Sequence, residues 1–452
     1  MKKYKFYLIV IVFSGFGCEG FLDEKPSMDL VVPSTVQDLR GLMDNQSYQM
    51  NNSPGLQLIG TDDVWTTTEG LLGYNSVETQ NAYVWNEIIF EGPNSADWEV
   101  AYRQIFYANV VLDLSDNIKG STPEEVAELR EVKGTALFLR GRALFDLMEI
   151  FAAPYSKGDE AGLGVVVRTV PTITEKQSRS SSKKCYEQIL TDLEAAIDLL
   201  PSTSLFPTRP TKAAAHGMLA RVNLVIGNYD EAFQNASEVL EADLTLMAYA
   251  GMDTLRTYSF DQFNQEVIYH SVMTLQSFHS SNLTYIDSLL VDSYQEGDLR
   301  KQLFFRGSGL EGYNFKGSYA GDNNLFSGIA LNEIYLILAE SSVRLNRVEE
   351  GIGYLNKLLE SRFDPGLYED ISNSLSQKEA LETILVERRK ELVFRGRRWS
   401  DLRRLNSEPM FAKTLKRNLD GIEFTLQPGS GRYVFPIPQE EIELNGLIQN
   451  QR

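Results

Sequence analysis

Residues 212–240, KAAAHGMLARVNLVIGNYDEAFQNASEVL, hold the pattern that decides the fold of this chain. In the first half of this stretch, apolar residues such as Leu219, Val222 and Ile226 recur every three or four positions. This spacing places them on one face of a helix. Because glycine and asparagine favour turns, Gly227 and Asn228 are expected to end that helix.

A second helix is expected to follow at once. Asp230 is its predicted N-cap, and its inner positions recur at the helical period from Ala232 to Leu240. Small side chains at Ala220 and Ala232 would let the two helices approach closely. The stretch therefore predicts an antiparallel helical hairpin.

The same design recurs at residues 332–360, NEIYLILAESSVRLNRVEEGIGYLNKLLE. A shift of about 119 residues places Ala339 on Ala220, and it places Asn346 on Gly227 and Gly351 on Ala232. Both units resemble tetratricopeptide (TPR) repeats. The alternative is a set of unrelated amphipathic helix pairs, but two units in one register favour a repeat.

Two further stretches have the composition of such helices. Residues 132–151 are expected to pair with residues 186–200 across a polar insertion, whereas residues 101–118 show no obvious partner nearby. The sequence thus predicts a mainly α protein in which about four helical hairpins form a right-handed stack.

The first 17 residues have the pattern of a secretory signal. Lys2, Lys3 and Lys5 precede an apolar run at residues 6–13, which is too short to span a bilayer. Cys18 follows directly and, with Gly17 before it, is the expected lipidation site of a bacterial lipoprotein. The alternative is a soluble protein from which the signal is simply cleaved.

The remaining cysteine, Cys185, is expected to be a free buried thiol, because the other cysteine is the expected acylation site. The formal net charge is −19, and the predicted signal carries three of the lysines, so a processed chain would be more acidic still. Repulsion from phosphate makes nucleic acid an unsuitable partner.

Two segments are rich in aromatic residues and poor in periodicity. Residues 19–109 carry three tryptophans among Asn, Thr, Gly and Asp, and residues 242–330 carry many tyrosines and phenylalanines. Both are expected to be loops laid against the helical scaffold, where binding residues commonly lie.

Three separated signatures then coincide: CEGFLD at residues 18–23, ERRKELVFRGRRWSDLRRLN at residues 387–406 and RYVFPIPQEEIELNGLIQN at residues 432–450. Together they resemble the SusD/RagB family of outer-membrane nutrient-binding lipoproteins, across essentially the whole mature chain. Arg395 departs from the family pattern, which more often has glutamate there, so the local salt bridge of that position is in question.

The resemblance implies a division of the chain. Residues 1–17 would be the signal peptide and residues 18–452 a single SusD-like domain. Within it, residues 18–210 would form the N-terminal part, 211–241 and 331–362 the TPR-like hairpins, 242–330 a loop-rich insertion and 363–452 the signature part.

The resemblance also implies a function. The protein would be lipid-anchored on the outer membrane, facing out, and would bind a polysaccharide or oligosaccharide without cleaving it. Its partner would be a SusC-like TonB-dependent transporter, to which it would deliver the glycan. The same architecture could instead capture a peptide or a glycoconjugate.

The middle signature is predicted to be structural. Charged residues in it fall on the helix face that also carries Leu381 and Leu392, so Arg388 is expected to be buried and paired with a carboxylate. We assign the same structural role to Glu387, Glu391, Arg395 and Trp399. A carboxylate held ionised by a neighbouring arginine is unsuited to general-acid catalysis.

No motif in the sequence points to an enzyme. The three histidines lack metal-ligand spacing, and His216 is expected to pack in the core. We therefore predict no catalytic residues and no cofactor, although a structural cation remains compatible with the oxygen-rich turns. A glycoside hydrolase is kept as an alternative, because two carboxylates distant in sequence suffice.

Aromatic loops suit sugars because the C–H faces of a pyranose stack on aromatic rings, while polar side chains bond the hydroxyls. Trp98 and Trp399 are assigned to the core instead. The candidate ligand-binding residues are Trp65, Tyr74, Tyr83 and Trp85, with Asp62, Asp63 and Asn81 as polar partners and Tyr313 and Tyr319 from the second segment.

Overall fold

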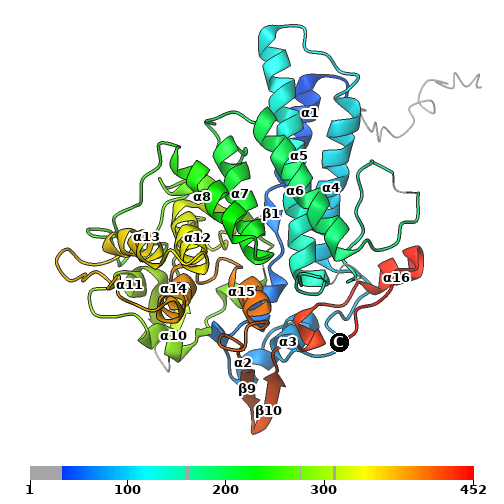
Figure 1. The fold of residues 1–452 in the computed structure, drawn as a ribbon. Helices are drawn as coiled ribbons and strands as arrows, with labels where there is room; N and C mark the ends of the chain where they lie inside the picture. Colours follow the sequence, from blue (N-terminus) through cyan, green and yellow to red (C-terminus); the bar gives the residue numbers. More distant parts are fainter. Residues whose placement is uncertain (1–32, 159–161, 173, 275, 309–311) are drawn as a thin grey trace, which may run out of the picture.

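The computed structural model describes residues 33–158, 162–172, 174–274, 276–308 and 312–452. The predicted signal peptide and the lipidation site Cys18 lie outside these residues. Over the described part of the chain the protein is mainly helical, as the sequence predicts (Figure 1).

The longer helices belong to the scaffold. They are α1 (Val36–Met43), α4 (Ala96–Leu114), α5 (Pro123–Phe151), α6 (Ser182–Leu199), α7 (Lys212–Val225), α8 (Tyr229–Leu240), α12 (Leu331–Arg344), α13 (Val348–Glu360), α14 (Gln377–Glu391) and α15 (Arg398–Leu405). The short helices are α2 (Thr68–Leu72), α3 (Val77–Tyr83), α9 (Ser277–Ser280), α10 (Ser288–Asp292), α11 (Arg300–Phe304) and α16 (Gln439–Asn445). Single turns of 3-10 helix are η1 (Gln46–Tyr48), η2 (Leu56–Gly60) and η3 (Gly431–Tyr433).

Helical hairpins follow one another through the molecule (Figure 1). Helix α5 packs on α6 across the polar insertion, α7 packs on α8, and α12 packs on α13. Neighbouring hairpins contact each other through α6 and α7 and through α8 and α12. Helix α4, for which the sequence offered no partner, packs on α5, and α14 covers α12 and α13.

The register predicted between the two repeats is confirmed by the backbone. Gly227 and Asn346 both adopt the left-handed conformation, with φ of +72° and +64°, at the turn between the helices of their hairpins. The expected cap Asp230 is wrong: Asn228 is the N-cap of α8, and Asp230 lies in its first turn, where its charge suits the positive end of the helix.

Gly351 is the closest contact between α12 and α13. A Cβ atom built on Gly351 would lie 2.6 Å from the backbone oxygen of Ala339 and 2.5 Å from Cγ2 of Val343. Gly351→Ala is therefore expected to lower the free energy of unfolding by about 1–3 kcal/mol, the cost of overpacking. Urea denaturation tests this, with Gly353→Ala as the control, because nothing lies within 4 Å of a Cβ there. Equal stability of the two variants would contradict the close contact.

The strands are short and form two-stranded pairs, all of them in the loop-rich segments except the C-terminal pair β9–β10. Strand β1 (Asn52–Ser53) pairs in parallel with β4 (Val272–Met273). The antiparallel pairs are β2 (Val64–Trp65) with β5 (Tyr285–Ile286), β3 (Val267–Tyr269) with β8 (Ile329–Ala330), β6 (Phe305–Ser308) with β7 (Gly312–Phe315), and β9 (Leu415–Leu419) with β10 (Ile422–Leu426). Two of these pairs, β1–β4 and β2–β5, fasten the N-terminal segment to the 242–330 segment, and β3–β8 joins two distant parts of the 242–330 segment itself.

Burial matches several expectations for single residues. Trp98, Trp399 and the free thiol Cys185 are buried, and burial raises the pKa of Cys185 to about 11. His216 is an exception, since it is only half-buried and its Nδ1 lies 3.0 Å from Oδ1 of Asn235 on α8. No helix within the described ranges is both long and apolar enough to cross a membrane.

Candidate functional site

The signature at residues 387–406 forms a buried ionic network, as predicted. Nε of Arg388 donates to Asp401 on α15 at 2.9 Å. Glu387 and Glu391 both accept from Arg300, an arginine of α11 that lies far away in the sequence. Because these charges pair with one another below the surface, the signature holds helices together.

Arg395 and Trp399 complete this structural region. The guanidinium of Arg395 lies 4.3 Å from the ring centre of Phe326 and 5.0 Å from that of Tyr319, and burial lowers its pKa. Two aromatic rings thus hold the charge at the position where the family more often has glutamate. Trp399 packs against Tyr433. Its ring also lies so close to Gly60 that a Cβ atom on residue 60 would clash with it.

Asp62 and Asp63 are ion-pair partners of arginines. Asp62 accepts two hydrogen bonds from Arg398, one from Nε at 2.7 Å and one from Nη2 at 2.8 Å. Asp63 accepts a hydrogen bond from Nε of Arg389 at 2.8 Å. Burial opposes ionisation of Asp62, but Arg398 and Arg389 outweigh it and hold its pKa well below the ordinary value. Burial raises the pKa of Asp63 despite Arg389. These carboxylates fasten their loop to α14 and α15, which corrects their expected role as free polar partners.

Most of the candidate rings lie in the interior. Tyr74, Tyr83, Trp85 and Tyr319 are each at most 5% exposed, so the expectation that they present ring faces outward is corrected. The burial is tolerated because each hydroxyl or indole N–H group makes a hydrogen bond within the protein. The hydroxyl of Tyr74 bonds Thr284 at 2.6 Å, Nε1 of Trp85 donates to the backbone oxygen of Gly60 at 2.8 Å, and the hydroxyl of Tyr319 donates to Glu266 at 2.7 Å.

Arg417, which the sequence did not single out, explains two of these rings. Its guanidinium lies 3.6 Å from the ring centre of Tyr83 and 4.7 Å from that of Trp85. It also donates to the backbone oxygens of Ile59 and Thr61 at 2.9 and 2.7 Å. Burial lowers the pKa of Arg417 to about 10. The two rings therefore hold a buried cation from β9.

Trp65, like Tyr313, is a candidate ring that remains partly exposed. It stacks on Tyr285 of β5, with ring centres 4.6 Å apart and an angle of 27° between the planes. Its Nε1 donates to the backbone oxygen of Ile286 at 3.1 Å, which fixes the indole on the strand pair. A Cβ atom on Gly312 would lie 3.9 Å from Cζ2 of Trp65 and 3.5 Å from Cδ1 of Tyr285, so β7 passes directly beside the stack.

Tyr285 was missed by the sequence analysis. The only signal is the short alternation Leu283–Thr284–Tyr285, which is too short to distinguish a strand from a loop. Asn81, by contrast, was proposed as a polar partner, and it donates to the backbone oxygen of Ile89 at 3.2 Å and shapes a turn after α3.

A recess of about 680 Å³ adjoins the stack on the other side of β7. Tyr313, the residue after Gly312, lines it and remains half-buried, with Nζ of Lys301 lying 5.7 Å from its ring centre. The stack and this recess together form the candidate binding face, to which β2, β5, β6, β7 and α11 contribute.

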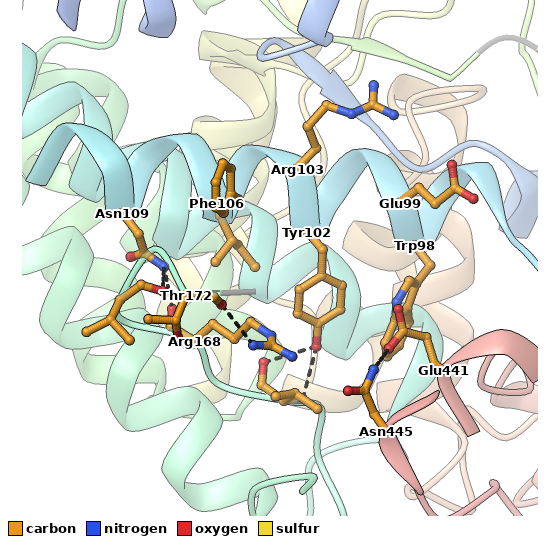
Figure 2. Close-up of a pocket in the computed structure, with 13 residues that line it drawn as sticks. Trp98, Glu99, Tyr102, Arg103, Phe106, Asn109, Arg168, Thr172, Glu441 and Asn445 are labelled. Atoms are coloured by element: carbon orange, nitrogen blue, oxygen red, sulfur yellow. Dashed lines mark hydrogen bonds between the residues drawn. The ribbon is translucent and has the colours of Figure 1, made fainter. Parts of the chain in front are cut away.

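A second recess, of about 420 Å³, lies between α4, residues 166–172 and α16 (Figure 2). Its polar groups mostly bond one another: the hydroxyl of Tyr102 donates to the backbone oxygen of Val166 at 3.0 Å, and Asn109 donates to that of Arg168 at 3.1 Å. These bonds attach a loop to α4. We assign this recess to packing between elements.

Among the residues that the structure describes, no three His, Cys, Asp or Glu side chains are placed to hold a metal ion. His270 and His279 are buried, and burial lowers their pKa values to about 4 and about 3. Both imidazoles are therefore neutral at physiological pH.

Comparison with known proteins agrees with this architecture. Residues 20–224 match a family model described as starch-binding and associating with the outer membrane, and residues 316–452 match the model of the SusD family. SusD-like protein P2 of Formosa agariphila is 24% identical over 99% of both chains.

Solved structures show the same fold. A putative sugar-binding protein of Bacteroides vulgatus has a TM-score of 0.76 and 24% identity, covering 93% of this chain and 99% of its own. A SusD superfamily protein of Bacteroides thetaiotaomicron has a TM-score of 0.75 and 24% identity, covering 92% and 100%. The fold is thus that of a helical-hairpin scaffold with an attached loop-rich part. The chain belongs to the SusD family.

Proposed function

We propose that this protein captures a polysaccharide or oligosaccharide at the cell surface and delivers it, uncleaved, to a SusC-like TonB-dependent outer-membrane transporter. In this proposal Cys18 carries the lipid anchor and the protein faces outward. Family membership supports the proposal, because the matching model is described as starch-binding and outer-membrane-associated.

The observation that carries the proposal is the stack of Trp65 on Tyr285. An indole held by a backbone hydrogen bond and a second ring is a rigid platform, and Trp65 as a residue is partly exposed. Such a face suits a pyranose, whose apolar C–H surface stacks on it at little entropic cost.

A platform of this kind is consistent with delivery. One ring stack beside an open recess gives few contacts with each sugar unit, so several weak contacts along a chain would add up to capture. Weak individual contacts also keep dissociation fast, and a glycan that is to be passed to a transporter must dissociate.

Trp65→Ala is expected to weaken glycan binding by about tenfold or more, since an aromatic stack of this size contributes about 1–3 kcal/mol. Titration of the purified protein against a polysaccharide panel, by calorimetry, measures this. Phe206→Ala is the matched control, because Phe206 is a 53% exposed ring against which the guanidinium of Arg209 lies. If both variants bind the preferred glycan as the wild type does, the platform is not the binding site.

The same purified protein tests two alternative functions, the capture of a peptide or glycoconjugate and the hydrolysis of a glycan. A panel that includes peptides and glycoconjugates separates a glycan ligand from those nutrients. A glycoside hydrolase would shorten the bound glycan during prolonged incubation. No carboxylate among the described residues lines the recess beside Tyr313, so a carboxylate pair acting there would need groups from elsewhere. A bound structural cation would show as a loss of thermal stability after chelation.

A further inference from the structure

The recess beside the stack is cationic. It lies between residues 254–257, α11 and the β6–β7 hairpin, and Arg256, Lys301, Arg306 and Lys316 line it. No Asp or Glu of the described residues lines it. Only Arg256 has a carboxylate partner there, Asp261 at 2.8 Å, in the part of the chain that the structure describes.

The other three cations contact neutral groups. Arg306 donates to the side-chain oxygen of Asn282 at 2.9 Å, and Lys316 donates to the backbone oxygen of Thr254 at 2.5 Å. Lys301 lies over the ring of Tyr313. None of the three has a carboxylate partner among the residues that line the recess, so positive charge is concentrated there.

The positive charge of the recess contrasts with the net negative charge of the chain. The chain as a whole carries −19, so its overall field repels anions. Partial burial lowers the pKa of Lys316, and the attraction of Asp253 is larger than the repulsion from Arg306. An anion between Arg306 and Lys316 would be attracted by both side chains, whereas a neutral sugar would gain no such attraction.

The recess also adjoins the aromatic platform. Gly312 of β7 lies against Trp65 and Tyr285, and the next residue, Tyr313, lines the recess. The stack and the recess are thus separated by the single strand β7, and a chain molecule that stacks one ring on Trp65 would have to pass over this strand to place a substituent of a neighbouring unit among the cations.

Building on the proposed function, we propose that the ligand is an acidic glycan, and that this recess takes an anionic substituent, a sulfate ester or a carboxylate, of a sugar near the one on Trp65. Lys301 of α11 and Arg306 of β6 bind the anion, and Tyr313 provides an apolar wall for the ring that bears it.

The experiment uses three polymers with one backbone: dextran, carboxymethyl-dextran and dextran sulfate. Binding of the full processed chain is measured by biolayer interferometry at low ionic strength and along a salt series. The wild type is expected to bind at least one charged dextran roughly tenfold or more tightly than dextran, with affinity that falls as salt rises. The two charged arms distinguish a carboxylate from a sulfate ester as the preferred group.

Two double variants test whether the cations of the recess, and not other lysines of the surface, bind the charged polymer. Lys301→Gln with Arg306→Gln is expected to abolish most of the preference for the charged polymer and to flatten its salt dependence. Lys378→Gln with Lys416→Gln is the control, because it removes two exposed lysines of α14 and β9 and so changes the net charge equally. The control is expected to bind within about twofold of wild type. Unchanged melting temperatures verify that both double variants fold.

Two results would overturn the proposal: charged dextrans that bind no more tightly than dextran, or an equal loss in the recess and control variants. Neither result is the failure of the proposed function. That function fails when no polysaccharide or oligosaccharide of the panel binds the protein, whatever the recess variants do.

Discussion

Arg362→Ala is expected to lower the free energy of unfolding by about 3–5 kcal/mol, the typical cost of breaking a buried ion pair. Arg362 is fully buried at the end of α13. Its Nε donates to Glu391 of α14 at 2.9 Å, and its Nη2 donates to both oxygens of Glu266 at 2.9 and 3.0 Å. The remaining nitrogen donates to the backbone oxygen of Met247 at 2.8 Å.

The cost is large because the carboxylates stay behind. Without Arg362, Glu266 would keep only neutral donors such as the hydroxyl of Tyr319, and Glu391 would share Arg300 with Asp298 and Glu387. Two buried carboxylates would then lie near each other with too little positive charge between them. Such groups must either take up protons or draw in water, and both weaken packing.

Urea denaturation at pH 7, followed by circular dichroism, measures the loss. Arg362→Lys keeps the charge but lacks the planar fork, so it is expected to fall between the wild type and Arg362→Ala. Arg347→Ala is the control, because Arg347 is half-exposed and lies 3.8 Å from Glu350 across the surface. A loss below about 1 kcal/mol in Arg362→Ala would show that the network is not needed for stability.

The sequence predicted one half of this network. Charges within the apolar stripe of residues 381–392 indicate a helix whose charged groups are buried and paired, and Arg388 and Glu391 are indeed buried. The other half, Glu266 and Arg300, lies in the loop-rich segment. Nothing local distinguishes those two residues from other charges in loops, because their partners are set by tertiary packing alone.

The hairpin scaffold was predictable for the opposite reason. Helical periodicity is local, and the small residues at Ala220, Ala232 and Gly351 mark close contacts within the hairpins themselves. The pairing of α5 with α6 across the insertion also followed from two amphipathic patterns. Two details differed: the cap of α8 lies two residues earlier, as helix boundaries often do, and His216 of α7 is only half-buried.

The binding face was harder to predict, because ring content does not reveal which face of a loop is outward. Trp65 and Trp85 have similar polar surroundings in sequence, yet Trp85 is buried on Arg417 and Trp65 stays partly exposed on Tyr285. Arg417 and Tyr285 lie hundreds of residues away along the chain from these tryptophans. Whether a tryptophan is buried or exposed therefore depends on contacts with residues distant in the sequence, which the periodicity of the sequence does not predict.

Below pH 4.5, the protein is expected to lose several kcal/mol of unfolding free energy, and α12 carries two of the responsible groups. Glu333 accepts two hydrogen bonds from Arg221, at 2.9 and 2.7 Å, and Glu340 accepts two from Arg404, at 2.6 and 2.8 Å. Burial opposes ionisation of both carboxyls, but the arginines outweigh it and lower each pKa to about 2.

The direction follows from proton uptake. In the unfolded chain these carboxyls take up protons near their ordinary pKa of 4.5, whereas in the folded protein they stay ionised until about pH 2. Their stabilising contribution is complete above pH 4.5 and is lost as the pH falls towards 2. Because each tenfold change in proton affinity corresponds to about 1.4 kcal/mol, each group contributes roughly 3 kcal/mol at neutral pH.

Asp97 has the opposite effect on the pH dependence of stability, and it acts at a higher pH. Its carboxylate accepts the backbone N–H groups of Gly55 and Leu56, but burial outweighs them and raises its pKa to about 6. Because the folded state binds this proton more tightly than the unfolded chain does, stability rises as the pH falls from above 6 towards 4. The loss due to Glu333 and Glu340 should therefore begin only below about pH 4.5, after a flat or slightly rising region.

Urea denaturation in steps from pH 7 to pH 2.5 measures this profile, and urea is preferred because guanidinium salt would screen the ion pairs. Glu340→Gln is expected to be less stable at pH 7 but to lose less between pH 4.5 and 2.5 than the wild type. Glu423→Gln is the matched control, because its exposed pair with Lys416 on the β9–β10 hairpin contributes little at any pH. Parallel curves for Glu340→Gln and the wild type below pH 4.5 would mean that the Glu340–Arg404 pair does not control acid stability, and the loss would then have to come from other carboxylates.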